Sequence, residues 1–272
     1  MGATRNLPEG PALPASESFP FPILERLADE PVTHFQVFGD KNSGTNFART
    51  LIGMNTQTPY RPIYGWKHGV PAMAAFEPGA LVVLLTRNAV DWAKGMYRQP
   101  HRNLPEDGEM PFADFLRAEW HSSVGRKPVR NWTKKWAVSA EEGFAHRELQ
   151  LDRHPLTGKR YANIFEMRRV KLAAMIGMRH RGVNFALARF EDVRRDPVGF
   201  VTGLSAAFDL ELQPDPAPPL HKVSPTRNSR RIVLTPEVLA PEDMGFLLDG
   251  LDRETEALAG YAYGPDGAPE LL

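Results

Sequence analysis

One segment, residues 34–54, constrains the fold of this chain more than any other. Its first five residues, HFQVF, are apolar and aromatic. A polar loop bounded by glycines follows, and TNFARTLIGM then has helical spacing of Phe47, Leu51 and Met54. This order predicts a strand, a loop and a helix in direct succession. Ser43 or Thr45 can cap the helix, and loop amides would then point toward its positive end, an arrangement that favours an anion.

Two later apolar runs repeat the strand pattern. Residues 80–88, ALVVLLTRN, are continuously apolar before a polar end, as expected for a strand buried on both faces. Residues 183–192, VNFALARFED, follow an amphipathic stretch whose helical stripe contains Ile164, Met167, Lys171, Ala174 and Met178. Strands that alternate with helices predict an α/β domain with a central, mainly parallel sheet. Ligands bind beyond the carboxyl ends of such strands, where the 39–46 loop and Arg87 are both expected.

The composition narrows the class of protein. The chain has 272 residues, 42% of them hydrophobic, which is enough for a sizeable core. Thirty-three basic residues balance thirty-three acidic ones, so a nucleic-acid partner is not expected. The absence of cysteine excludes disulfides, thiolate metal sites and thiol nucleophiles. No signal-peptide pattern and no 18-residue apolar run are found, so we expect a cytoplasmic protein without a membrane span.

The chain is predicted to form one domain with two special segments. Residues 1–30 are rich in proline and are expected to form a flexible arm. Residues 31–272 would then be a single α/β domain. Within it, residues from about 98 to 160 have many Pro, Trp, Arg and His residues and weak periodicity, which favours a lid or an insertion that faces an acceptor substrate.

The loop itself departs from the familiar nucleoside-triphosphate motif. Gly39 to Gly44 has the G-x-x-x-x-G frame of a P-loop, but Thr45 and Asn46 stand where that motif has Lys and then Ser or Thr. A kinase or NTPase needs that lysine for the terminal phosphates and that hydroxyl for magnesium. The lysine of this loop is Lys41, inside the frame. The pattern favours a bound phosphate that is not transferred with magnesium, and an ordinary glycine turn is the alternative.

The segment KNSGTN (41–46) resembles the 5′-phosphosulfate loop of sulfotransferases that use 3′-phosphoadenosine-5′-phosphosulfate (PAPS), with one residue more between Lys and Ser. The resemblance implies a P-loop-type three-layer α/β fold and PAPS as the sulfuryl donor, with no metal. It also implies that Lys41 contacts the oxygen that bridges phosphate and sulfate. The 5′-phosphate would be held by the loop amides and the Thr45 hydroxyl, from the residues Asn42, Ser43, Gly44, Thr45 and Asn46.

Two further segments are similar to the same family. GWKHGVP (65–71) resembles its Lys-His-Pro segment, which would make His68 the general base, a role that suits an imidazole. LLTRNAVDWAKGMYR (84–98) resembles the segment whose Arg, with a Ser eight residues later, binds the 3′-phosphate. Arg87 matches that Arg, and Gly95 stands at the Ser position. The alternatives are a structural histidine and an arginine that caps the sheet or pairs with a carboxylate.

The later matches are weaker. ARFEDVRRDP (188–197) resembles a segment in which Glu191 or Asp192 would cap and orient the next helix. SPTRNSRRIVLTPE (224–237) lies where many family members have a basic loop on the 3′-phosphate, so Arg227, Arg230 and Arg231 are candidates. A basic surface loop before a helix that begins near residues 235–237 is the alternative.

Together these patterns predict metal-free, in-line transfer of a sulfuryl group from PAPS to a hydroxyl or amine of a small-molecule or glycan acceptor. His68 would remove the acceptor proton while Lys41 stabilises charge on the leaving phosphate. A P-loop small-molecule kinase or another NTP-dependent enzyme is one alternative. A non-catalytic nucleotide-binding domain is the other, and Gly95 in place of Ser favours it. The sequence specifies neither the acceptor nor the oligomeric state.

Overall fold

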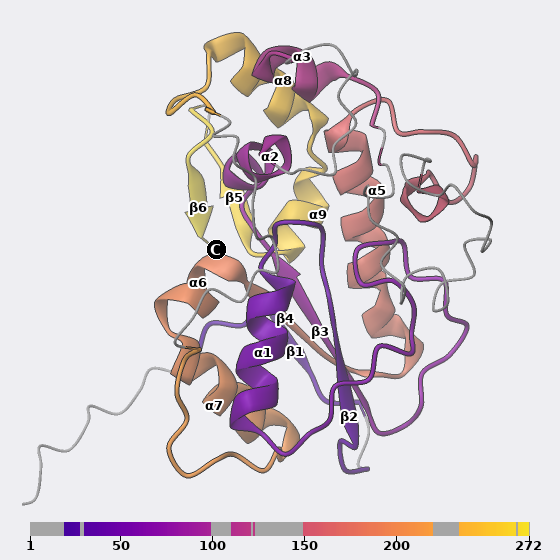
Figure 1. The fold of residues 1–272 in the computed structure, drawn as a ribbon, viewed down its shortest axis with the longest axis vertical. Coiled ribbons are helices and arrows are strands. Elements are labelled where there is room, and N and C mark those ends of the chain that lie inside the picture. Colours follow the sequence, from indigo (N-terminus) through magenta and orange to yellow (C-terminus); the bar gives the residue numbers. More distant parts are fainter. Residues whose placement is uncertain are drawn as a thin grey trace, which may run out of the picture.

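The computed structural model describes residues 19–27, 30–98, 110–120, 122, 149–219, 234–264 and 266–271. Its centre is a four-stranded sheet (Figure 1) with the order β1-β4-β3-β2. These strands are β1 (Ile23–Glu25), β2 (His34–Phe38), β3 (Ala80–Thr86) and β4 (Asn184–Arg189). The pairs β2–β3 and β3–β4 are parallel and β1 is antiparallel to β4, which confirms a mixed α/β domain with a mainly parallel sheet.

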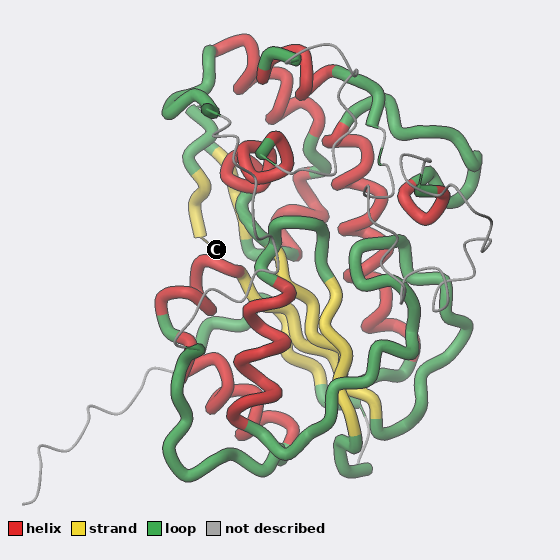
Figure 2. The backbone as a smooth tube through the Cα atoms, viewed as in Figure 1, coloured by secondary structure: helices red, strands yellow, loops and turns green. Residues whose placement is uncertain are grey.

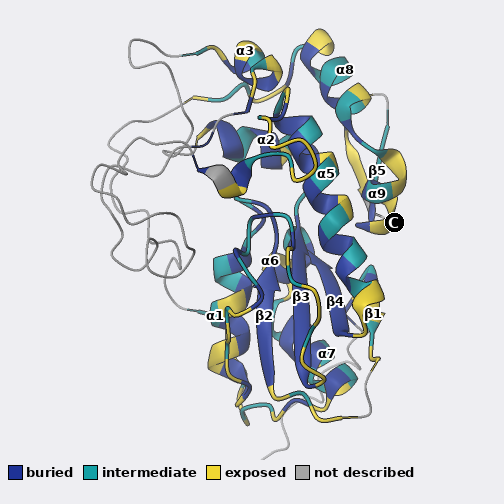
Figure 3. Cartoon of the chain, turned by 90° about the vertical axis from the view of Figure 1, so that its right-hand side faces the viewer, coloured by how far each residue is buried: buried dark blue, intermediate teal, exposed yellow. Residues whose placement is uncertain are grey.

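Helices cover both faces of the sheet (Figure 2). On one face, α1 (Thr45–Asn55) and α7 (Pro197–Phe208) pack on a core that contains Phe35 and Val83. On the other face, α5 (Ile164–Ile176) continues into the 3₁₀ turn η2 (Gly177–Arg181) and packs on Phe38 and Val82. Successive strand residues point to opposite faces, so two covered faces require apolar side chains at nearly every position. Every residue of β2, β3 and β4 is buried (Figure 3).

A third group of elements lies beyond the carboxyl ends of the parallel strands (Figure 1). It comprises α2 (Ala89–Tyr97), α3 (Phe112–Arg117), α8 (Pro241–Gly250) and α9 (Arg253–Leu258), with the hairpin β5 (Tyr261–Tyr263) and β6 (Pro269–Leu271). Trp92, Phe165 and Leu247 belong to its apolar core. Two short elements complete the described chain, the 3₁₀ turn η1 (Gln150–Asp152) and α6 (Phe190–Arg195). The site described below lies between this group and the sheet.

The predicted N-terminal arm is too long at its carboxyl end. Residues 1–18 lie outside the described residues, but Phe19 is buried, with its ring centroid 5.4 Å from that of Phe200. Strand β1 then pairs with β4, and Arg26 forms a 2.5 Å ion pair with Asp209. The ordered domain therefore begins inside the predicted arm, because its apolar residues complete the core under α7.

The structure bears on two other expectations: it describes only part of the predicted insertion, and it shifts the predicted start of a later helix. Most of the predicted insertion, residues 99–109, 121 and 123–148, lies outside the described residues. Helix α8 begins at Pro241 and not near residues 235–237; a proline thus stands in its first turn, where proline is well tolerated. Among the helices in the described residues, none has the length and apolar character needed to span a bilayer.

Candidate functional site

The loop between β2 and α1 has a shape that requires its two glycines. Gly39 and Gly44 have φ values of 146° and 88°, in the region that L side chains rarely adopt. A Cβ atom on Gly39 would collide with the Leu85 carbonyl oxygen, and one on Gly44 with the Phe190 ring. Asn42, the additional residue between Lys41 and Ser43, has φ 68°, which asparagine tolerates better than most residues. The extra residue is therefore accommodated as a left-handed turn.

The start of α1 leaves backbone amides for an anion. Gly44 is the N-cap, and no side chain caps the helix, so the prediction of a Ser43 or Thr45 cap is wrong. Instead, the Ser43 hydroxyl and amide both donate to the Asp40 carbonyl oxygen, at 2.7 and 3.2 Å, and close the loop. In the described part of the chain, the amides of residues 44–46 donate to no backbone carbonyl. They lie at the positive end of the helix.

A lysine outside the loop lies at the same helix start. Lys67 Nζ is 3.0 Å from Thr45 Oγ1 and 2.5 Å from Asn46 Oδ1, the two residues at the usual P-loop Lys and Ser/Thr positions. Burial and the nearby Arg49 lower the pKa of Lys67 to about 8. Sequence reasoning did not assign this residue. It adds positive charge where the loop amides already favour an anion.

His68 is anchored to the loop through Gly39. The Gly39 amide donates to the Lys67 carbonyl at 3.0 Å, and His68 Nδ1 is 2.6 Å from the Gly39 carbonyl oxygen. A carbonyl can only accept, so Nδ1 carries the hydrogen and a neutral ring has its lone pair on Nε2. Within the described residues, Nε2 has no hydrogen-bond partner. Burial, with smaller contributions from Lys67, Lys41 and Lys171, lowers the pKa of His68 well below its ordinary value.

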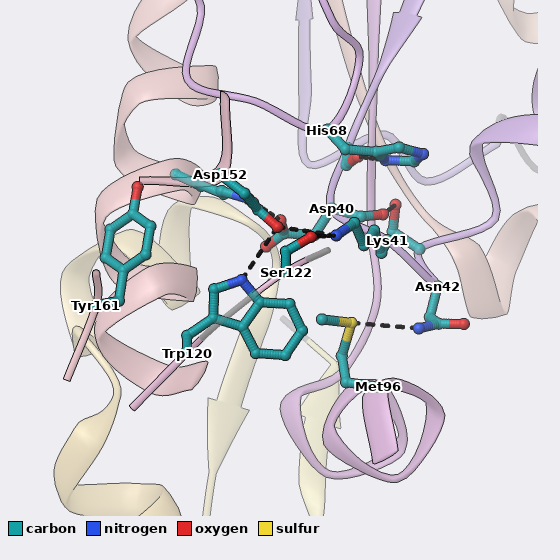
Figure 4. Close-up of polar contacts among 12 residues, drawn as sticks. Asp40, Lys41, Asn42, His68, Met96, Trp120, Ser122, Asp152 and Tyr161 are labelled. Atoms are coloured by element: carbon teal, nitrogen blue, oxygen red, sulfur yellow. Dashed lines mark hydrogen bonds and ion pairs between the residues drawn. The ribbon is translucent and has the colours of Figure 1, made fainter. Parts of the chain in front are cut away.

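Lys41 points away from the backbone of the loop into a cluster of charged and aromatic side chains (Figure 4). Its Nζ atom is 2.8 Å from Asp152 Oδ2 and 2.8 Å from Ser122 Oγ. It also lies 5.4 Å from the ring centroids of Trp66 and Trp120. The backbone is held too, because Trp92 Nε1 donates to the Lys41 carbonyl oxygen at 3.0 Å. Lys41 is thus fixed at both ends.

Two buried aspartates with opposite pKa shifts complete the cluster. Asp152 also bonds Lys171 on α5 and accepts from Trp120 Nε1 at 3.1 Å. Burial alone would raise the pKa of Asp152, but Lys171 and Lys41 hold it well below its usual range. Asp40 Oδ1 is 3.9 Å from Lys171 Nζ and, within the described residues, has no hydrogen-bond partner. Burial therefore raises the pKa of Asp40 to about 6, although Lys171 opposes the shift.

Arg87 and Gly95 lie beside the loop, as the order of strands predicts. Arg87 follows β3, with its Nη2 atom 3.6 Å from Asp91 Oδ2 and its guanidinium 5.4 Å from the Phe190 ring centroid. Its buried Nε has no partner in the described part of the chain. A Cβ on Gly95 would lie 3.2 Å from Asn42 Cβ and 3.6 Å from Arg87 Nη1. The inserted loop residue therefore occupies space next to Gly95.

Arg168 and the half-buried Glu191 hold the turn that carries Arg87. Arg168 donates to the Arg87 carbonyl oxygen at 2.9 Å, and its guanidinium pairs with both carboxylate oxygens of Glu256, at 2.6 and 2.8 Å. Glu191 accepts from the Asn88 amide and side chain, at 3.0 and 2.6 Å. Glu191 thus orients the β3–α2 turn, and the next helix, α7, is capped by Asp196, which corrects the expectation that Glu191 or Asp192 caps it. Asp192 instead pairs with Arg189 and Arg195.

The structure therefore brings together the loop residues 41–46, His68, Arg87 and Gly95, while Arg227, Arg230 and Arg231 lie outside the described residues. Sequence reasoning missed Asp40, Lys67 and Asp152. The chain matches none of the family models, curated proteins or solved structures with which it was compared.

Proposed function

We propose that this protein is a PAPS-dependent sulfotransferase of the P-loop-type three-layer fold, which transfers a sulfuryl group to a hydroxyl or amine acceptor. One observation carries the proposal: His68 donates from Nδ1 to the carbonyl of Gly39, the first glycine of the loop before α1, which leaves the lone pair of a neutral ring on Nε2, and the lysine of the same loop is Lys41. This combination provides a base, a cation and an anion cradle within one short stretch of backbone.

We assign groups among the described residues to each part of the donor. The amides of residues 44–46 and Lys67 would hold the 5′-phosphosulfate group at the start of α1. Arg87 has a planar guanidinium that can make two bonds to the 3′-phosphate. Phe47 and Phe190 are half-buried, with ring centroids 6.4 Å apart, and Phe190 lies beside both Gly44 and Arg87. These rings offer apolar faces for an adenine base.

The chemistry assigned to the residues follows from their protonation. PAPS would supply a sulfur atom whose bond to the phosphate oxygen breaks as a bond to the acceptor forms. His68 Nε2 would take the acceptor proton, and the Gly39 carbonyl would continue to accept from Nδ1 of the resulting imidazolium. Lys41 would donate to the oxygen that gains charge, which stabilises the transition state more than the ground state.

One observation favours a second candidate, an NTP-dependent P-loop enzyme such as a small-molecule kinase. Lys67 reaches the two positions, Thr45 and Asn46, at which the usual motif has its own lysine and hydroxyl. A lysine supplied from another segment could serve terminal phosphates in the same place. Turnover of ATP with a strict magnesium requirement would establish this alternative.

The proposal is tested first by binding. Adenosine 3′,5′-bisphosphate, the nucleotide product, should raise the melting temperature, because a ligand at a hundred times its Kd adds about 2.7 kcal/mol to the free energy of unfolding. Adenosine 5′-monophosphate and magnesium-ATP are the matched comparisons. If millimolar bisphosphate left the melting temperature unchanged, that result would contradict the assignment. Transfer of radiolabelled sulfuryl from PAPS to a panel of phenols, alcohols and amines then tests catalysis.

A further inference from the structure

Lys41 is an ammonium group in an environment that disfavours its charge. Its side chain is 14% exposed, and the second lysine of the cluster, Lys171, is 1% exposed. Both bond the same carboxylate: Asp152 Oδ2 lies 2.8 Å from Lys41 Nζ, while Oδ1 bonds Lys171. A partly buried and a fully buried ammonium group thus share the fully buried Asp152 carboxylate. Burying a charge is costly unless an opposite charge or hydrogen bonds compensate for it.

The Asp152 carboxylate also gives Lys41 a direction. Trp120 Nε1 donates to Asp152 Oδ2 at 3.1 Å, and the Asp152 amide donates to the Leu149 carbonyl at 3.0 Å, so both the carboxylate and the backbone of Asp152 are held in place. An ammonium group has three N–H donors. In the described part of the chain, Asp152 and Ser122 take two of them. The third N–H of Lys41 Nζ remains for an anionic ligand, and the two bonds to Asp152 and Ser122 set the direction in which this N–H points.

We propose that Asp152 is a positioning residue for Lys41, which keeps the Lys41 ammonium charged and oriented for transfer; this inference rests on the proposed function. Asp152 lies 111 residues after Lys41 in the sequence and belongs to the predicted insertion, in the part that the structure describes from residue 149 onward. It does not itself contact the reacting atoms in this role. Its effect is exerted through the charge and position of Lys41.

The groups that face Lys41 define the expected pH dependence. They are Asp152, Asp40, Lys171, His68 and Ser122, with the Trp66 and Trp120 rings. Burial lowers the pKa of Lys41, Asp152 raises it, and Lys171 lowers it. Without the Asp152 charge, the remaining carboxylate is Asp40, whose own pKa is raised to about 6. Asp152→Asn should therefore let Lys41 lose its proton at a lower pH, whereas Lys171→Gln should have the opposite effect.

The experiment measures the protonation of Lys41 directly, without any substrate. The full-length protein is acetylated with trace acetic anhydride, which reacts only with neutral amines, at a series of pH values, and peptides are quantified by mass spectrometry. The exposed Lys159 is the internal reference. Each Lys41 rate is divided by its high-pH plateau, so that altered access to the reagent cancels. At pH 7.5, Asp152→Asn should raise this ratio about tenfold, and Lys171→Gln should lower it.

Ser122→Ala is the matched control, because it removes a hydrogen bond to Lys41 but no charge, and its ratio should stay near that of the wild type. An unchanged ratio in Asp152→Asn, or a change of the same sign in both charge variants, would overturn the inference. If Asp152→Asn does not fold, the Lys171→Gln shift alone decides, since it leaves Asp152 paired with Lys41.

Turnover of PAPS with a phenol acceptor then links the protonation to catalysis. Activity requires charged Lys41 and neutral His68, so Asp152→Asn should move the alkaline limb of the pH profile to lower pH, and Lys171→Gln should move it to higher pH. A fall in rate with an unmoved limb would mean a purely structural role and refute the proposal. If the wild type bound no nucleotide and transferred nothing, the proposed function would fail, while the labelling result would still decide what Asp152 does for Lys41.

Discussion

A histidine lies near each end of strand β2, and the two histidines are hydrogen-bonded in different ways. At the amino end, His34 is fully buried, with Nδ1 2.9 Å from Thr33 Oγ1 and Nε2 2.8 Å from the Tyr64 hydroxyl. Beyond the carboxyl end, His68 uses Nδ1 on the Gly39 carbonyl and, among the described residues, leaves Nε2 unbonded. Burial lowers the pKa of both rings. The difference therefore lies in which ring nitrogens are already bonded.

Two arginines beyond the ends of the strands show the same contrast. Arg168 is buried and its guanidinium is bonded to Glu256 and to the Arg87 carbonyl oxygen. Arg87 has a buried Nε without a partner in the described chain. An unmade bond at a buried polar atom costs free energy, so native proteins keep such atoms few. Buried polar atoms without partners that gather at the carboxyl edge of the sheet, where ligands of parallel sheets bind, indicate a binding site and not only a structural role.

The largest expected effect separates the two histidines. His68→Ala should reduce sulfuryl transfer by about 10²- to 10⁴-fold, the usual contribution of a general base, with little change in the affinity for adenosine 3′,5′-bisphosphate. His34→Ala should lower the melting temperature but leave the turnover per folded molecule unchanged. Turnover from radiolabelled PAPS and calorimetric melting measure both. Equal turnover in His68→Ala and the wild type would refute its role as base.

The next effect concerns the pH dependence of folding. The folded state raises the pKa of Asp40 from 3.8 to about 6, so between these values the folded chain holds a proton that the unfolded chain has lost. Stability from this group is therefore fully present below about pH 4 and is lost as the pH rises through 6, by up to about 3 kcal/mol. Asp152 has the opposite shift, and its contribution is lost only under more acidic conditions.

Asp40→Asn should remove the loss of stability between pH 4 and 6 that Asp40 causes. Urea unfolding at intervals from pH 4 to 8 measures it: the free energy of unfolding of the variant should rise relative to the wild type as the pH increases. Parallel curves for the two proteins would contradict the assignment of a buried, weakly bonded carboxylate. Asp209, which is exposed and pairs with Arg26, is the matched control as Asp209→Asn.

Much of the carboxyl edge can be predicted from the sequence because its residues directly follow strands. The apolar runs determine where β2 and β3 end, and parallel strands place the residues after them at one edge, so the loop and Arg87 had to lie together. These are local signals, and the structure confirms the strands and the meeting of the two segments.

The charged cluster could not be predicted in the same way. Asp152 lies in a segment without periodicity, and only tertiary packing brings it to Lys41. One signal did exist: Lys171 shares a helical stripe with Ile164 and Met167, and a lysine at a core position needs a buried anion. The stripe shows that such an anion must exist, but not which of the acidic residues supplies it.

A further pair of effects distinguishes the two arginines. Arg87→Ala should weaken the binding of adenosine 3′,5′-bisphosphate by about tenfold or more, since a hydrogen bond to a charged group contributes about 1.5–3 kcal/mol, and it should affect adenosine 5′-monophosphate much less. Arg168→Met should instead destabilise the fold by about 3–5 kcal/mol, because Glu256 would be left buried and unpaired. Calorimetric titration and urea unfolding give both quantities. If Arg87→Ala weakened the binding of both nucleotides equally, Arg87 would not be a ligand of the 3′-phosphate.

The smallest effect tests whether the inserted loop residue and Gly95 depend on each other. In Gly95→Ser the new Cβ would lie 3.2 Å from Asn42 Cβ and 3.3 Å from Asn42 Cγ, closer than side chains normally approach. The bisphosphate affinity should therefore fall by a few-fold, although a hydroxyl has been added beside Arg87. Asn42→Gly removes the obstructing side chain and keeps the left-handed turn. The double variant should then bind at least as well as Asn42→Gly alone. If Gly95→Ser alone improves binding, the two positions are independent, and the carboxyl edge simply lacks a donor that any serine can supply.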